Sequence, residues 1–245
     1  MNARRTLATA KRVLLQLRHD PRTLLLIVGV PILLVTLLRY VFDDSPAIFQ
    51  QFGPIVLGLF PFTVMFIVTS ITTLRERTSG TLERLLAMPA GKLDLLLGYA
   101  IAFGVMAVIQ ALAVSAVALG PLDLNIEGSV VSLVAAATLD GLLGMALGLF
   151  VSAFARTEFQ AVQFMPAVVL PQYLLCGLFI DRDQMAPLLR DVSDWLPLSY
   201  SVDMIERVAR DTAITSELTG DFLIVLAFGV GALVLGAAPL RRRSA

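Results

Sequence analysis

The chain has 245 residues, of which 57% are hydrophobic and 16% are charged, and its 19 basic residues balance its 19 acidic residues. The high apolar content excludes a disordered chain, and the charged fraction is well below the roughly 25% of a soluble domain. The absence of a basic surplus argues against a nucleic-acid partner, and a single cysteine and a single histidine leave no metal cluster or disulfide framework. The composition therefore predicts an all-α integral membrane protein.

Six apolar stretches have the length that a helix needs to cross a bilayer, about 20 residues with a range of roughly 17–25. They cover residues 24–42, 55–74, 95–119, 130–155, 164–180 and 222–240. The fifth is short and contains Pro166 and Pro171, so we expect it to be bent or partly unwound. The pattern predicts one transmembrane domain over residues 1–245.

The basic residues fall mostly on one side of these stretches. Fourteen of the 19 lie in the N-terminal arm, the second and fourth connections and the C-terminus, whereas residues 181–221 are acidic. Because cytoplasmic loops carry an excess of Lys and Arg, both termini are predicted to be cytoplasmic. We therefore expect a multi-pass membrane protein.

The N-terminal arm is amphipathic at the period of a helix, which Asp20 and Pro21 then end. The residues predicted to share the apolar sector are Leu7, Ala10, Val13, Leu14 and Leu17. Arg4, Arg5, Lys11, Arg12 and Arg18 occupy the opposite sector. A basic amphipathic helix beside a span is typical of the inner interface, where cations face anionic headgroups. It would be either an elbow that moves with the first span or a passive anchor.

The second connection, residues 75–94, is the most informative stretch. Gly80 or Thr81 can open a short helix, and Pro89 stops it. An apolar stripe of Leu82, Leu85 and Leu86 lies beside Glu83 and Arg84. Such a helix suits docking into a groove of a soluble partner, although it could instead lie on the membrane surface.

Residues 181–221 contain two runs with helical spacing. The first comprises Met185, Leu188, Leu189, Val192, Trp195 and Leu196, and the second comprises Val202, Ile205, Val208 and Ala209. Because Trp and Tyr favour the headgroup level, Trp195 and Tyr200 predict two short helices at the outer interface. Packing alone explains the same pattern.

Asp140 lies near the middle of the fourth stretch. It could be a proton site or a substrate contact, or a neutral packed residue hydrogen-bonded beside Thr138. The packed interpretation is favoured because no second charge lies at comparable depth. Gly144 and Gly148 give this helix a small-residue face, which we expect to pack within the subunit rather than between subunits.

Other residues of the apolar stretches could line a path for an amphipathic substrate. These candidates are Phe62, Phe66, Gln110, Gln163, Gln172 and Tyr173, together with Asp140. Each is also explained by ordinary helix packing.

Two sequence motifs resemble those of the ABC-2 type permeases, the membrane subunits of ATP-binding-cassette exporters. The first is Arg75-Glu76 with Gly80-Thr81-Leu82-Glu83-Arg84-Leu85-Leu86 and Pro89. The second is Gly177-Leu178-Phe179-Ile180 followed by Trp195-Leu196-Pro197-Leu198-Ser199-Tyr200. Length and span number fit as well, so the resemblance extends over essentially the whole chain.

The resemblance implies that the helix 81–88 receives the stroke of an ATPase. The implied coupling residues are Glu76, Gly80, Leu82, Glu83, Arg84, Leu85, Leu86 and Pro89, and the implied outer gate includes Trp195, Pro197 and Tyr200. Gly91-Lys92 lacks the rest of a phosphate-binding loop, so ATP and Mg²⁺ would bind two copies of a separate ATPase, and this chain is not expected to be an enzyme.

The resemblance also implies a dimer in the bacterial inner membrane, with a second copy of this chain or a homologous permease, that exports an amphipathic drug, antibiotic or lipid. A polysaccharide or glycolipid exporter is an alternative within the same class. A proton-coupled secondary transporter or channel that uses Asp140 is an alternative of another class.

Overall fold

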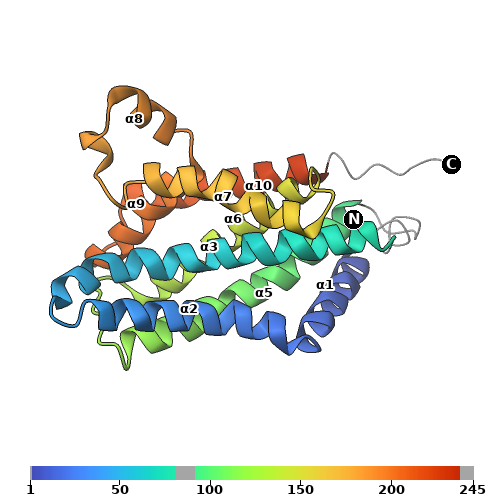
Figure 1. Cartoon of the computed structure of the whole chain (residues 1–245), viewed down its shortest axis with the longest axis horizontal. Coiled ribbons are helices and arrows are strands. Elements are labelled where there is room, and N and C mark those ends of the chain that lie inside the picture. Colours follow the sequence, from blue (N-terminus) through green and yellow to red (C-terminus); the bar gives the residue numbers. More distant parts are fainter. Residues whose placement is uncertain (1, 81–91, 238–245) are drawn as a thin grey trace.

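The computed structural model describes residues 2–80 and 92–237, which form helices joined by turns, with no strand among them. The helices that run along the bundle are α2 (Pro21–Val41), α3 (Pro46–Thr78), α5 (Lys92–Leu119), α6 (Val130–Ser152), α7 (Glu158–Leu175) and α10 (Ser216–Ala237). The others are α1 (Ala3–Arg18), η1 (Arg182–Gln184), α8 (Pro187–Ser193) and α9 (Pro197–Arg210). Figure 1 shows α1 crossing one end of the bundle and α8 projecting at the other end.

The first two helices meet at the predicted junction. Helix α1 ends at Arg18, and Asp20 caps α2 by accepting the Thr23 N–H at 3.2 Å. Pro21 occupies the first turn of α2. A backbone N–H at this position makes no hydrogen bond within the helix, so a proline, which lacks it, is tolerated there. The Asp-Pro pair therefore ends one helix and starts the next.

Five helices are long and apolar enough to cross a membrane: residues 21–41, 46–78, 94–119, 130–152 and 216–236. They correspond to five of the six predicted spans, although α3 begins nine residues earlier than expected. Helix α7 is not among the five. It continues through Pro166 and Pro171 and ends at Leu175, so the predicted extension to residue 180 is wrong. The six-span count stays a prediction.

Helices α3 and α6 form the centre of the bundle and pack backbone against backbone. A Cβ atom on Gly144 would lie 2.1 Å from the Phe62 carbonyl oxygen, and one on Gly148 would lie 2.4 Å from that of Phe66. Only a residue without a side chain permits this approach. The prediction that this glycine face packs within the subunit is confirmed.

The segment after α7 folds into η1, α8 and α9, so the two predicted short helices are present. Gly177, at φ +96°, turns the chain out of α7 in a conformation that favours glycine. Helix α9 buries Val202, Ile205 and Val208 against the bundle. By contrast, Leu188 on α8 is exposed. The position of α8 at the outer interface stays a prediction.

Candidate functional site

The end of α3 and the start of α5 flank the segment that carries the predicted coupling residues. Helix α3 ends at Thr78, and Gly80 takes a positive φ of +70°. The predicted helix 81–88 lies outside the described residues, as do Leu82, Glu83, Arg84, Leu85, Leu86 and Pro89. A movement of this segment would reach the rest of the chain through the end of α3 and the start of α5.

Helix α1 contacts both flanks through carboxylates. Arg12 Nη1 lies 2.9 Å from Glu76 Oε1, in the last turns of α3. The backbone N–H of Asn2, the N-cap residue of α1, donates to Asp94 Oδ1 at 2.9 Å, in the first turn of α5. Both carboxylate residues are buried, Glu76 at 7% exposed and Asp94 at 4%. The N-terminal helix thus holds together the two chain segments on either side of the predicted coupling helix.

Tyr99 completes this cluster from α5. Arg12 Nη2 donates to the Tyr99 hydroxyl at 3.2 Å, and the guanidinium lies 6.0 Å from the centre of the Tyr99 ring. Arg12 therefore contacts α3 and α5 at once. A cation between a buried carboxylate and an aromatic ring is held firmly, because losing either partner leaves a charge in a poorly solvated place.

The last turns of α3 also contact α6 and α7. Arg75 forms a bidentate ion pair with Glu158, in which Nε lies 2.8 Å and Nη2 lies 3.0 Å from the carboxylate oxygens. Arg77 donates to the Ser152 carbonyl at the end of α6. The end of α3 is consequently bonded to α1, α6 and α7, and a displacement of α3 would reach all three.

Asp140 lies in the core where α3, α6 and α9 meet, and it is fully buried. A Cβ atom on Gly58 would lie 3.5 Å from Asp140 Oδ2, and Ser201 is the polar side chain that approaches the carboxyl group. Among the described residues, neither Asp140 oxygen has a partner with ordinary hydrogen-bond geometry. Thr138 donates to the Val134 carbonyl, and the packed interpretation of Asp140 stays a prediction.

The other predicted path residues separate into two groups. Phe62, Phe66 and Gln110 are fully buried, Gln172 donates to the Val168 carbonyl, and Tyr173 bonds Thr63 on α3. Gln163 instead lies exposed on α7. The structure brings the first group into the protein core and leaves Gln163 on the surface. Their part in a substrate path stays a prediction.

Among the predicted gate residues, Tyr200 contacts Arg182, and its helix α9 lies at the end of the bundle opposite α1 (Figure 1). Arg182 Nη1 donates to Asp203 at 2.7 Å, and Nη2 donates to Asp194. Its guanidinium lies 5.7 Å from the centre of the Tyr200 ring. The Tyr200 hydroxyl donates to the Asp194 carbonyl at 2.9 Å. Arg182 thus ties the segment around α8 to the first turns of α9.

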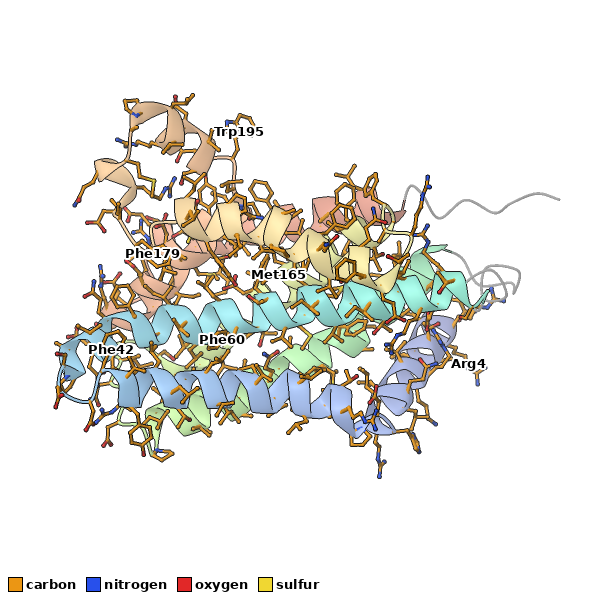
Figure 2. The ribbon with its side chains drawn as sticks, viewed as in Figure 1. Arg4, Phe42, Phe60, Met165, Phe179 and Trp195 are labelled. Atoms are coloured by element: carbon orange, nitrogen blue, oxygen red, sulfur yellow. The ribbon has the colours of Figure 1, made fainter. Side chains whose placement is uncertain are left out.

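A polar hollow of about 560 Å³ lies beside Arg182. Burial raises the pKa of Asp203 in its wall, although the positive charge of Arg182 opposes this effect. Pro197 is buried at the start of α9, whereas Trp195, just after α8, is 80% exposed. Figure 2 shows Trp195 beside the projecting segment that contains α8. A gate at this place stays a prediction.

Most of the chain matches a single protein family. Residues 4–208 match the family model described as ABC-2 type transporter. The chain belongs to the ABC-2 type transporter family. The match extends from α1 to α9 and so includes the Arg12 cluster, Asp140 and the Arg182 cluster.

Individual relatives of this ABC-2 chain are bacterial and eukaryotic. It is 29% identical over 204 residues to the probable multidrug ABC transporter permease YbhS of Escherichia coli, covering 81% of this chain and 51% of YbhS. It is 26% identical over 180 residues to the inner membrane transport permease YhhJ of the same organism, covering 73% and 48%. ABC transporter G family member 20 of Dictyostelium discoideum is 25% identical over 125 residues, covering 51% and 17%. The chain spans about half the length of its bacterial relatives.

Arg12, Tyr99 and Arg182 are site residues that the sequence did not single out. Arg12 was placed among the cations that face headgroups, and Tyr99 lay within an apolar stretch. A helical period gives the face of a residue but not its partner, and Glu76 lies 64 positions away from Arg12. The one local indication was Tyr99 itself, an aromatic residue five positions after Asp94.

Proposed function

We propose that this chain is the permease subunit of an ATP-driven exporter and that a separate ATPase acts on residues 79–93. Membership of the ABC-2 family and five apolar helices of spanning length support the class. The observation that carries the coupling assignment is the position of α1. It bonds Glu76 before this segment and Asp94 after it.

In this mechanism the ATPase pushes on the predicted helix 81–88 when it closes around ATP. The push displaces the end of α3 and the start of α5 together, because α1 holds both. Through Arg75 and Glu158, the same displacement reaches the start of α7. The spans then tilt, substrate leaves at the outer end, and hydrolysis of ATP resets the transporter.

The distribution of charge supports a cytoplasmic location for this end of the bundle. Helix α1 and the C-terminal end of α10 lie at the same end (Figure 1). The cations of α1 lie there together with Arg75, Arg77 and Arg156, whereas the opposite end holds the acidic segment 181–221. By the positive-inside rule, both termini belong in the cytoplasm.

The exposed face of α7 supports a partner permease at this helix. Its exposed residues at helical spacing are Gln163, Pro166, Ala167, Leu170, Pro171 and Leu174. The two prolines cannot donate to the carbonyls of Val162 and Ala167, four positions earlier. Lipid offers no hydrogen-bond donor to such carbonyls. A second copy of the chain, or a pathway between two copies, would cover this face better than acyl chains.

An amphipathic small molecule is the proposed substrate class. YbhS and YbhR of Escherichia coli carry the description of probable multidrug ABC transporter permeases. The core around Asp140, with Ser201 and Tyr173 nearby, offers polar atoms within an otherwise apolar bundle. Such a setting suits a molecule with one polar and one apolar part.

Substitutions in the predicted coupling helix test the proposed function. We expect Glu83→Ala and Leu85→Asp each to reduce ATP-driven efflux by about tenfold or more, because losing about 1.4 kcal/mol of coupling has that effect. Dye efflux from cells that also make the ATPase subunit measures this. Leu85→Met is the matched control, since it keeps an apolar side chain of similar size.

Membrane levels of the chain should stay unchanged in both variants, because neither position lies in an apolar stretch. Efflux retained at the wild-type level in both Glu83→Ala and Leu85→Asp would contradict the assignment of this segment.

A further inference from the structure

Helix α1 exposes a stripe in which cations and leucines share one face. Thr6, Ala10, Val13 and Leu17 are its buried residues. The exposed stripe consists of Arg4, Leu7, Lys11, Leu15 and Arg18, which fall within about 80° of the helix circumference. Leu7 is 59% exposed and Leu15 is 42% exposed, so Leu7, which was expected in the apolar sector, lies uncovered beside the cations.

The cations of this stripe lack acidic partners. Within the described parts of the chain, Arg4, Lys11 and Arg18 take part in no ion pair. Helix α1 itself contains no acidic residue. Three unpaired cations beside exposed leucines form a surface that attracts an anion with an apolar part.

A hollow of about 540 Å³ lies along the same helix. It is lined by Ala8, Lys11, Arg12, Leu15, Gln16 and His19. Lys11 and Arg12 supply N–H donors suited to a phosphate group, and Ala8 and Leu15 supply apolar wall. The hollow therefore offers both parts that a phospholipid would contact.

The next helix, α2, also exposes leucines near its start. Leu25 and Leu26, in the first turns of α2, are 69% and 54% exposed. A lipid whose headgroup lay on α1 could place its acyl chains along these leucines. Inorganic phosphate would leave the leucines uncovered, which favours a lipid as the occupant.

We propose that the exposed stripe and hollow of α1 bind the headgroup of an anionic phospholipid of the inner leaflet. This inference rests on the proposed function only for the cytoplasmic location of α1. Because Arg12 borders the hollow and also holds Glu76 and Tyr99, the lipid would lie directly against the cluster that joins α3 to α5.

Native mass spectrometry of the purified chain in detergent tests the proposal without ATP or an ATPase. The probes are phosphatidylglycerol, phosphatidylcholine and inorganic phosphate. We expect the wild-type chain to retain phosphatidylglycerol in preference to phosphatidylcholine. The triple variant Arg4→Gln, Lys11→Gln and Arg18→Gln should weaken that retention by about tenfold or more, since each cation contributes to attraction by anionic lipid.

The matched control removes three exposed cations elsewhere: Arg156→Gln, Arg190→Gln and Arg210→Gln. It lowers the net charge equally and should keep the preference for phosphatidylglycerol. Helical content measured by circular dichroism shows whether each variant is folded, and Lys11→Arg should retain wild-type binding.

Several results would overturn the proposal. They are equal loss in both triple variants, no preference in the wild-type chain, and displacement of the lipid by millimolar inorganic phosphate. Unchanged lipid retention with reduced co-purification of the ATPase would overturn it too, since it would make α1 a protein-docking surface. A chain that binds the lipid but fails to export with ATP would contradict the proposed function alone.

Discussion

Replacing Gly144 with valine is expected to prevent the chain from forming a stable helix bundle. The first added carbon atom would lie 2.1 Å from the Phe62 carbonyl oxygen and 2.8 Å from its carbonyl carbon. Both belong to the α3 backbone, which cannot rotate away as a flexible side chain can. Overpacking a core commonly costs about 1–3 kcal/mol, and a clash with backbone should exceed that range because α3 and α6 must separate.

Gly231→Val is the control for this experiment. Gly231 lies within α10, and nothing lies within 4 Å of the position that its Cβ would take. The low helix propensity of valine applies equally at both positions and so cancels. Thermal unfolding of the detergent-extracted chain, followed by size-exclusion chromatography, should show a large loss for Gly144→Val and little for Gly231→Val. Equal melting of the two variants would contradict the close packing of α3 and α6.

Separating Arg12 from Glu76 is expected to uncouple ATP hydrolysis from transport. The side chain of Glu76 is 9% exposed and that of Arg12 is 27% exposed, so removing one partner should cost near the lower end of the about 3–5 kcal/mol of a fully buried pair. Arg12→Gln and Glu76→Gln should therefore each reduce efflux by tenfold or more, since about 1.4 kcal/mol already changes an equilibrium tenfold. The exchange Arg12→Glu with Glu76→Arg keeps an ion pair and should recover part of the loss.

Arg75→Gln breaks a second, weaker link from the end of α3 and should reduce efflux less than Arg12→Gln does, by about fivefold at most. Arg75 and Glu158 also join two helices at the same end, but their side chains are 60% and 51% exposed, and exposed pairs contribute about 0–1 kcal/mol. ATP hydrolysis and dye efflux should be measured together in proteoliposomes. Hydrolysis that continues while efflux falls is the expected signature of Arg12→Gln. If the exchange variant were no better than the single variants, a direct role of the pair would be ruled out.

The apolar runs predicted the helices well because a span needs length and apolarity, which a sequence displays directly. The close contact at Gly144 and the helix break at Asp20 were also predictable, since small-residue spacing and an Asp-Pro pair act locally. The end of α7 was not, because Gly177 turns the chain while the apolar residues Leu178, Phe179 and Ile180 continue.

The Arg12 cluster could not be predicted because its members come from three distant segments. Periodicity placed Arg12 on a polar face, and nothing in the sequence said that this face meets Glu76 and Tyr99. Asp140 is a partly predictable case. Its burial follows from its depth in the apolar stretch, but the approach of Ser201 depends on how α9 packs against the bundle. Tertiary packing, not local propensity, decides both cases.

Reconstitution of the chain in proteoliposomes tests the central claim most directly. The vesicles would contain this chain, with or without its ATPase subunit, and a fluorescent amphipathic dye. We expect dye transport to require the ATPase and ATP, to be independent of an imposed proton gradient, and to persist in Asp140→Asn, which keeps the size of the side chain. Transport driven by the proton gradient without ATP, and abolished by Asp140→Asn, would contradict it.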